Sequence, residues 1–253
     1  MKSLQKIIMI IMVATTVATI RYCSKPKNRN PEEIIIGTSA DFAPFSFIDG
    51  TGNIAGFDID LINELFTRLQ IVYHLENMPF ETLLTQMQFG SIDLIAAGMS
   101  HTPERAARVL FSTPYIEADP LAIITLSSNK TINSLTDLYG KTVAVNQGYV
   151  ADLQLSQQPE INLLRLPSMS DALLALKHGK IDAFVTGGGT IKPLQDALGS
   201  ETITVTPIPE LQEYTALGIS KKLPQLKEKI DTVIQEMQND GTLARLKEKW
   251  HLA

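Results

Sequence analysis

Residues 80–105, FETLLTQMQFGSIDLIAAGMSHTPER, contain the pattern that decides the fold class. Paired leucines at helical spacing lead to Gly90, where the helix is expected to end, and a short apolar strand then runs to Gly98. The start of a second helix follows directly after the strand. This order of helix, glycine and strand is typical of α/β proteins.

The same unit occurs a second time, in residues 171–188, DALLALKHGKIDAFVTGG. The Ile-Asp dipeptides that begin at Ile92 and Ile181 align at a constant offset, and Gly98 then corresponds to Gly187. The paired leucines align only with a slip of one residue. Helix–glycine–strand units are common enough to match by chance, but the pair indicates two lobes built on one plan.

The rest of the chain alternates between strands and amphipathic helices in the same way. Such alternation predicts mostly parallel sheets, whose ligands bind beyond the carboxyl ends of the strands. The clearest segments are strands at 33–38 and 141–146 and helices at 58–69, from 149 onward, at 223–237 and at 242–250.

The N-terminal segment has a different character. Lys2 and Lys6 precede residues 7–20, a run of fourteen residues without a charge. This run is too short to cross a bilayer comfortably, but it has the size of a signal-peptide core behind a positively charged start. We therefore expect residues 1–22 to be a signal peptide and residues 23–32 a polar tether. The remaining chain is then expected in the periplasm or at the extracytoplasmic membrane surface.

The only cysteine, Cys23, follows this run closely. A chain with one cysteine has no internal disulfide, so the residue gains no structural role from an oxidising compartment. Its position is typical of a lipid-modified N-terminal cysteine. Tyr22 and Arg21, however, stand where a bacterial lipoprotein normally has a small residue. Lipid anchoring through Cys23 and plain periplasmic secretion both remain open.

Composition and charge exclude several classes of protein. With 44% hydrophobic and 19% charged residues in a chain of 253, disordered and fibrous classes are excluded. Removing residues 1–22 removes three positive charges and no negative ones, which moves the formal charge from −5 to −8. An acidic chain without a basic stripe is a poor nucleic-acid binder. Nucleic acid is therefore excluded as a partner.

Neither a cofactor nor a metal is expected. The glycine-rich residues 187–190 lack the Lys-Ser/Thr of a phosphate-binding loop. The histidines are scattered and form no pair at metal-ligand spacing, and no Gly-x-Ser-x-Gly motif is present.

Residues 98–105, GMSHTPER, lie at the carboxyl end of the first predicted strand. Thr102 is expected to be the N-cap of a helix with Pro103 at its first position. Arg105 then falls in the first turn, where the helix macrodipole disfavours a cation. A carboxylate held by N–H groups, a hydroxyl of Ser100 or Thr102 and the forked guanidinium would explain its presence. A local ion pair, for example with the neighbouring Glu104, is the alternative.

Together with GMSHTPER, further stretches in the same order resemble the polar amino-acid solute-binding proteins of bacterial ABC transporters. They are GTSADFAPFSFIDGTGNIAGFDIDL (37–61), FETLLTQMQFGSIDLIAAGMSHTPER (80–105), VLFSTPY (109–115), DLYGKTVAVNQG (137–148) and NDGTLARLKEKW (239–250).

The resemblance covers essentially all of residues 33–250. It implies the type II periplasmic-binding-protein fold: two α/β lobes, each a mostly parallel sheet flanked by helices, with the ligand cleft between them. Lobe 1 would comprise 33–117 plus 216–253 and lobe 2 would comprise 118–215. The chain would cross between the lobes near 117–121 and near 213–218.

The resemblance also implies ligand-binding roles in the first lobe. Arg105 would bind the α-carboxylate of the ligand, with help from Ser100 and the neighbouring Gly98 and Met99 in the same segment. Phe42 matches an aromatic residue that stacks on the ligand, and Phe80 matches the residue that often faces it. For either phenylalanine, an ordinary place in the core is the alternative.

In the second lobe, Gln147 and Gly148 match the segment that closes over the carboxylate, and Tyr149 stands where the family usually has threonine. Gly187 stands where family members place the acid that binds the α-ammonium group. Asp182 begins the strand and is expected to face away from the cleft. The acid that pairs with the α-ammonium group must therefore come from elsewhere, or the ligand must differ from a standard α-amino acid.

The resemblance also bears on the specificity for the side chain of the ligand. Ser39 stands where receptors for basic amino acids often carry an acid, although Asp41 lies two residues on. Arginine is our first expectation for the ligand, and glutamine is the second.

The resemblance therefore implies a non-catalytic, monomeric receptor that delivers a free amino acid to a membrane permease. An enzyme on the same scaffold, such as a cyclohexadienyl dehydratase or a peptidoglycan lyase, is the alternative from another class. His101 would be its candidate proton donor, although a histidine there could equally point to solvent. A sensor domain of a larger receptor is disfavoured because the sequence ends at Ala253 without a signalling module.

Overall fold

A computed structural model of the chain describes residues 33–252. Residues 34–253 form one compact unit. The predicted signal peptide, the tether and Cys23 lie outside the described residues. Within residues 33–252, no helix is long and apolar enough to span a membrane.

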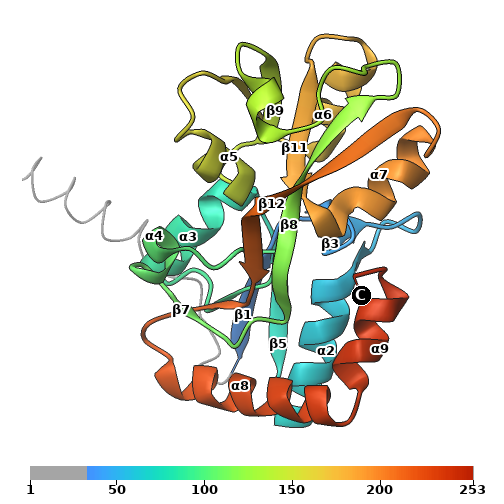
Figure 1. The fold of residues 1–253 in the computed structure, drawn as a ribbon. Coiled ribbons are helices and arrows are strands. Elements are labelled where there is room, and N and C mark those ends of the chain that lie inside the picture. Colours follow the sequence, from blue (N-terminus) through green and yellow to red (C-terminus); the bar gives the residue numbers. More distant parts are fainter. Residues whose placement is uncertain (1–32, 253) are drawn as a thin grey trace, which may run out of the picture. The chain divides into compact units, whose positions relative to one another are not determined.

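The first lobe is built on a five-stranded sheet in the order β5-β1-β6-β13-β7 (Figure 1). Strands β5, β1 and β6 are parallel, and β13 is antiparallel to both of its neighbours. The residues between β1 and α2 form a small antiparallel sheet in the order β2-β3-β4. The strands are β1 (Ile34–Thr38), β2 (Asp41–Phe42), β3 (Ser46–Ile48), β4 (Ile54–Ala55), β5 (Tyr73–Asn77), β6 (Leu94–Ile95), β7 (Leu110–Phe111) and β13 (Gly218–Ile219).

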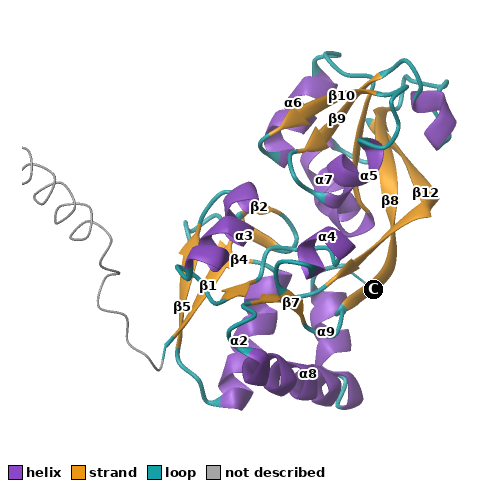
Figure 2. Cartoon of the chain, turned by 90° about the vertical axis from the view of Figure 1, so that its left-hand side faces the viewer, coloured by secondary structure: helices purple, strands orange, loops and turns teal. Residues whose placement is uncertain are grey.

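The helices of this lobe come from both ends of the described chain. Helix α2 packs against α8 and α9, so the C-terminal segment completes a lobe that the N-terminal half begins (Figure 2). An apolar stripe of α2 that includes Ile59, Ile62 and Leu65 is buried, as the sequence predicted. The helices are α2 (Phe57–Leu69), α3 (Phe80–Phe89), α4 (Pro103–Ala106), α8 (Pro224–Asn239) and α9 (Thr242–Lys249).

The second lobe is built on a sheet in the order β10-β9-β11-β8-β12. Its first three strands are parallel, and β8 is antiparallel to both β11 and β12. The strands are β8 (Ile116–Leu126), β9 (Thr142–Asn146), β10 (Asn162–Leu166), β11 (Ala183–Gly187) and β12 (Ile203–Thr215). The helical segments are η1 (Leu135–Leu138), α5 (Val150–Leu155), α6 (Met169–Lys177), η2 (Gly188–Thr190) and α7 (Ile191–Leu198). This architecture confirms the predicted two-lobed α/β class, with a mixed rather than purely parallel sheet in each lobe.

The long strands β8 and β12 pair with each other and connect the two lobes (Figure 1). At its far end β12 reaches the first lobe, where Thr215 bridges to Ser100 and the N–H of Ala216 donates to the carbonyl of Met99. The segment that carries Arg105 is therefore hydrogen-bonded to the strand pair that joins the lobes.

The two helix–glycine–strand units have equivalent structures. In the first, the N–H of Ile35 donates to Asp93 Oδ2 at 2.9 Å, and in the second the N–H of Thr142 donates to Asp182 Oδ2 at 2.8 Å. Each aspartate thus ties its strand to the start of the neighbouring parallel strand. The predicted repeat is real in structure, and Asp182 lies at the start of its strand as expected.

Candidate ligand-binding site

Arg105 is held in place by a short local motif. The side chain of Thr102 caps α4 by accepting a hydrogen bond from the N–H of Arg105, and Pro103 occupies the first turn, which confirms both predictions. The helix is only one turn long, from Pro103 to Ala106, so its macrodipole is weak. Arg105 lies in this first turn, as predicted, and burial of its side chain affects its charge more strongly than the dipole of so short a helix.

Arg105 is 4% exposed, and its guanidinium is bonded to carbonyl oxygens from both lobes. Nη1 donates to the carbonyl of Ser100 and Nη2 to the carbonyl of Gly148, each at 2.7 Å. The guanidinium also lies over the ring of Phe80, 5.3 Å from its centroid. Burial lowers the pKa of Arg105 to about 10, so the group stays protonated at neutral pH.

No ion pair in the described part of the chain compensates this charge. Within residues 33–252, no carboxylate lies within 4.0 Å of the Arg105 guanidinium, so the expected alternative of a local pair with Glu104 does not form. A buried cation opposed only by carbonyl dipoles is costly, and a bound carboxylate would relieve that cost.

The predicted aromatic pair of Phe42 and Phe80 is in contact with a tyrosine of the second lobe. Tyr149 stacks on Phe80 with ring centroids 3.9 Å apart and lies 4.5 Å from Phe42 at a tilt of 43°. All three rings are buried. Burial raises the pKa of Tyr149 well above its usual range, and a hydrogen bond with Ser39 opposes that shift. Tyr149 thus occupies the aromatic surface where the stem of a ligand was expected.

The residues before Arg105 are already hydrogen-bonded within the protein. The N–H of Gly98 donates to the buried carboxylate of Asp58 at 2.6 Å, so this N–H is not a donor for a ligand in this structure. Met99 is buried in the core. The hydroxyl of Ser100 donates to Glu213 Oε2 at 2.6 Å. Ser100 therefore contacts Arg105 through its carbonyl and Glu213 through its hydroxyl.

Gly187, the last residue of β11, and the two glycines that follow it make room for two acids from the strands that connect the lobes. A Cβ placed on Gly187 would lie 2.0 Å from Glu213 Oε1, and one on Gly188 would lie 2.3 Å from Asp119 Oδ1. The N–H of Gly189 donates to Asp119 Oδ2 at 2.8 Å. Gly187 itself offers no side chain, and carboxylates from β8 and β12 take up the space beside it.

Glu213 and Asp119 are cross-strand partners in the β8–β12 ladder. Burial raises the pKa of Glu213 to about 7; the hydrogen bond from Ser100 lowers it and the neighbouring Asp119 raises it. Burial also raises the pKa of Asp119. Residue 213 was predicted to lie at a crossing between the lobes, but neither Glu213 nor Asp119 was predicted to belong to the site. Three successive glycines at a strand end were the available signal.

The remaining predicted residues lie around this centre. Gly148 has a positive φ of 79° and, besides its bond to Arg105, donates its N–H to Asp152. The side chain of Gln147 is exposed, and its N–H donates to the carbonyl of Leu166. Ser39 is buried and donates to Asp41 Oδ1 at 2.8 Å.

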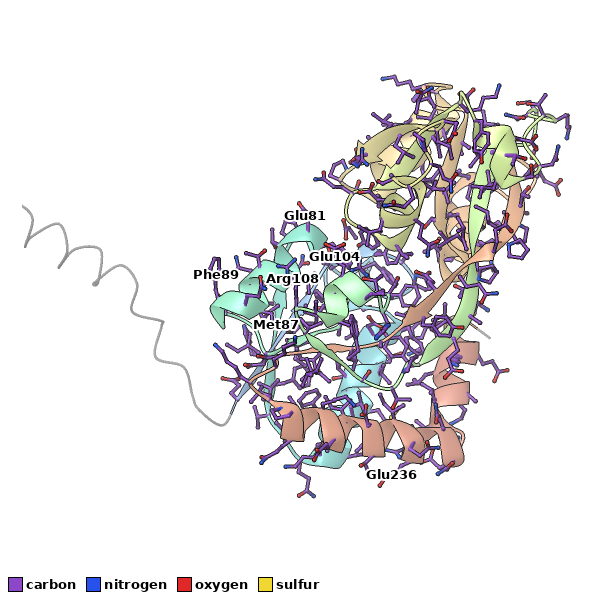
Figure 3. All side chains as sticks on the ribbon, turned by 60° about the vertical axis from the view of Figure 1, so that its left-hand side comes forward. Glu81, Met87, Phe89, Glu104, Arg108 and Glu236 are labelled. Carbon is purple, nitrogen blue, oxygen red and sulfur yellow. The ribbon has the colours of Figure 1, made fainter. Side chains whose placement is uncertain are left out.

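A cleft of about 410 Å³ lies beside these residues and is lined from both lobes. Two acids, Asp41 and Glu81, belong to its lining. Glu81, at the start of α3, and Glu104, on α4, both lie on the side of the first lobe that faces the second lobe (Figure 3). The lining residues are Ser39, Ala40, Asp41, Asn77, Met78, Pro79, Phe80, Glu81, Pro167 and Ser168.

Comparison with known proteins assigns the family. The family model described as bacterial extracellular solute-binding proteins, family 3, matches residues 34–253. The chain belongs to this family. Because its members are extracellular, the solute-binding protein acts outside the cytoplasm.

Three relatives are informative. The probable ABC transporter arginine-binding protein ArtJ of Chlamydia trachomatis is 31% identical over 228 residues, which cover 88% of this chain and 87% of ArtJ. An ancestral arginine-binding protein bound to glutamine is 31% identical with a TM-score of 0.82, over 89% of this chain and 100% of that one. An ancestral amino acid-binding protein, AncCDT-1, described as a precursor of cyclohexadienyl dehydratase, is 29% identical with a TM-score of 0.78, over 87% and 95%.

Proposed function

We propose that this solute-binding protein is the substrate-binding component of an amino-acid ABC transporter. It binds one free polar or basic amino acid between its lobes, arginine first and glutamine second, and delivers it to a membrane permease. The observation that carries the proposal is Arg105: a buried, charged guanidinium without an ion pair in the described residues, bonded to both lobes.

The carboxylate of the amino acid binds to Arg105. A guanidinium presents parallel N–H donors that match the two oxygens of a carboxylate. In this structure, carbonyl oxygens of Ser100 and Gly148 accept those donors, and the two carbonyls come from different lobes. A carboxylate that takes over these bonds joins the lobes, and the permease distinguishes the closed form from the open one. We propose 33–117 with 216–253 and 118–215 as the two bodies that move.

The cleft supports a basic or amide side chain. Its lining includes Asp41, Glu81 and Phe80, and the faces of Phe42 and Phe80 can hold a planar guanidinium or amide once Tyr149 moves off them. Asp41 accepts a hydrogen bond from Ser39 and so supplies the acid that position 39 lacks. The arginine-binding relative ArtJ and the glutamine-bound ancestral protein agree with these two ligands.

We propose that the protein is not an enzyme. His101, the candidate proton donor, is exposed, and its ring lies against Phe111. The likeness to AncCDT-1 does not favour catalysis, because that protein is itself described as amino acid-binding. Within the described residues, no group of three His, Cys, Asp or Glu side chains could hold a metal ion.

We further propose that the protein is a monomer, and that Cys23 either carries a lipid or is retained unmodified after secretion. Mass spectrometry of the mature protein distinguishes the two states of Cys23. Light scattering of the purified protein tests the monomer.

Thermal unfolding of the purified protein with each common amino acid tests the function. A ligand at a hundred times its dissociation constant stabilises the folded state by about 2.7 kcal/mol. For a chain of this size, that raises the melting temperature by about 5–10 °C. We expect this shift from arginine or, as the second candidate, from glutamine. No shift with any amino acid, together with a shift from a keto acid or a prephenate-like compound, would reject the receptor and favour the enzyme.

A further inference from the structure

Glu213 carries a buried carboxylate with fewer hydrogen-bond donors and cations around it than such a group normally has. It is 7% exposed, and its Oε2 accepts the hydroxyl of Ser100. No donor within residues 33–252 forms a hydrogen bond with its Oε1, and no basic side chain there lies within ion-pair distance of it. Buried carboxylates are normally paired with a cation or with several donors, because an isolated one is expensive to bury.

The carboxylate lies close to Arg105 without pairing with it. Ser100 separates the two groups: its carbonyl accepts from Arg105 Nη1 at 2.7 Å, and its hydroxyl donates to Glu213 at 2.6 Å. One residue therefore holds a fixed cation on one side and a fixed anion on the other. An α-amino acid carries the complementary charges, a carboxylate and an ammonium group, on one carbon atom.

The surroundings of Glu213 also keep a place for this carboxylate. A side chain on Gly187 would collide with Glu213 Oε1, and a side chain on Gly188 would collide with Asp119. Asp119 uses Oδ2 to hold the N–H of Gly189, so it fixes the position of the glycine loop.

We propose that Glu213 binds the α-ammonium group of the amino acid whose carboxylate Arg105 binds, with Ser100 setting the spacing between the two. The inference rests on the proposed function. It assigns the ammonium-binding acid to β12, the strand that connects the lobes, and it leaves Asp119 the positioning role of holding the glycine loop.

The test compares ligands that differ only in the ammonium group. Calorimetric titration measures arginine against 5-guanidinopentanoate, and glutamine against glutaramate, which keep the carboxylate and the side chain but lack the ammonium group. We expect the wild-type protein to prefer the amino acid by about 100-fold. Glu213→Gln keeps an acceptor for Ser100 but loses the charge, and it should reduce this preference to within about 10-fold, the scale of a lost charge-assisted hydrogen bond.

Asp119→Asn is the matched control, because it removes the neighbouring carboxylate and keeps an oxygen for the N–H of Gly189. It should preserve the preference for the amino acid. A double variant tests whether the acid can be moved. Glu213→Ala should lose the preference for the amino acid. Glu213→Ala combined with Gly187→Asp places an acid on β11, in the space that Glu213 vacates, and should restore the preference. Unfolding curves without ligand confirm that each variant is folded.

The possible outcomes separate the two proposals. If Glu213→Gln weakens the amino acid and its deaminated counterpart equally, Glu213 only holds the strands that connect the lobes. The inference is then overturned, while the proposed function stands. If the wild-type protein binds no amino acid, the proposed function fails and the inference fails with it.

Discussion

The two helix–glycine–strand units begin alike and end differently. Both begin their strands with the same aspartate-to-backbone bond, through Asp93 and Asp182. After the first strand, the chain turns at Gly98 with φ of 58° and brings Arg105 back into the buried centre. After the second strand, it continues through glycines beginning at Gly187, where φ is −67°.

This difference shows how one supersecondary unit can serve two purposes. The first unit contributes the charged side chain of Arg105. The second contributes glycines, whose lack of a side chain leaves space. The space beside the second unit is filled by acids from β8 and β12, so the acidic half of the centre belongs to the strands that connect the lobes.

Arg105→Ala removes the contribution of the first unit. We expect the affinity for the amino acid to fall by about 1,000-fold or more, because a buried charge-assisted pair is lost and its partner is left unpaired. The variant should fold, since it removes rather than adds a buried charge. Calorimetric titration measures the loss. Arg108→Ala is the control: this arginine hydrogen-bonds Gln88 at the surface of the same lobe (Figure 3). Comparable losses in both variants would contradict the assignment of Arg105.

Alanine at the two equivalent glycines should separate binding from stability. Gly187→Ala requires no unusual backbone angle but displaces the carboxylate of Glu213, so we expect affinity to fall by about 10–100-fold with little change in unfolding. Gly98→Ala must adopt a positive φ and lies 3.0 Å from the rings of Phe42 and Phe45, so it should cost about 1–3 kcal/mol of folding free energy. Chemical unfolding and titration together measure the contrast, and equal effects on unfolding would contradict it.

The pH dependence of binding should follow Glu213. Its pKa is raised to about 7 in the unliganded protein, where Ser100, Asp119, Arg105 and the backbone of Gly187 surround it. Below that pH the group is mostly protonated, whereas an ammonium group favours the ionised form, so binding must release a proton. We expect affinity to fall by up to about tenfold per unit as the pH decreases below 7. Titrations in buffers of different ionisation enthalpy detect the released proton, and Glu213→Gln should lack this release.

Stability should show the opposite sign. Burial raises the pKa of Asp58 to about 7, against hydrogen bonds from Gly98 and Tyr115 that lower it. An acid whose pKa is higher in the folded state binds more protons there than when unfolded. Its contribution to stability therefore declines as the pH rises from about 4 to 7. Denaturant unfolding of the unliganded protein should show this decline, and Asp58→Asn should flatten it. An unchanged slope in the variant would assign the decline to Glu213 alone.

Tyr149→Thr should give the smallest effect. The substitution removes the ring that lies against Phe42 and Phe80, and it makes the ring surfaces of both phenylalanines available to the ligand. We expect affinity to rise by about 3–10-fold, the scale of one aromatic contact. Tyr139→Thr, at an exposed position of the second lobe, is the control and should change nothing. A loss of affinity in Tyr149→Thr would show that the tyrosine is itself part of the binding surface.

Local features were predictable from the sequence. The cap at Thr102, the apolar stripe of α2 and the repeated Ile-Asp start of two strands all depend on residues a few positions apart. Their chemistry is visible in the sequence because helix and strand periods act over short distances.

The acidic half of the site could not be predicted in the same way. Glu213 and Asp119 meet because β8 and β12 pair in one register, and both meet the glycines because β11 lies on the other side of β8. Neither the strand register nor the strand order can be predicted from the residues next to Glu213 or Asp119 in the sequence. The contact of Tyr149 with Phe42 and Phe80 likewise depends on how the two lobes meet.

The arrangement around Ser100 has a consequence for handedness. A guanidinium and a carboxylate on either side of one residue fix two substituents of a tetrahedral carbon, and the buried ring of Phe80 beneath Arg105 fixes where a third can lie. Three fixed substituents distinguish a molecule from its mirror image. We therefore expect this site to accept one enantiomer of its amino acid and to reject the other, although both carry the same charges.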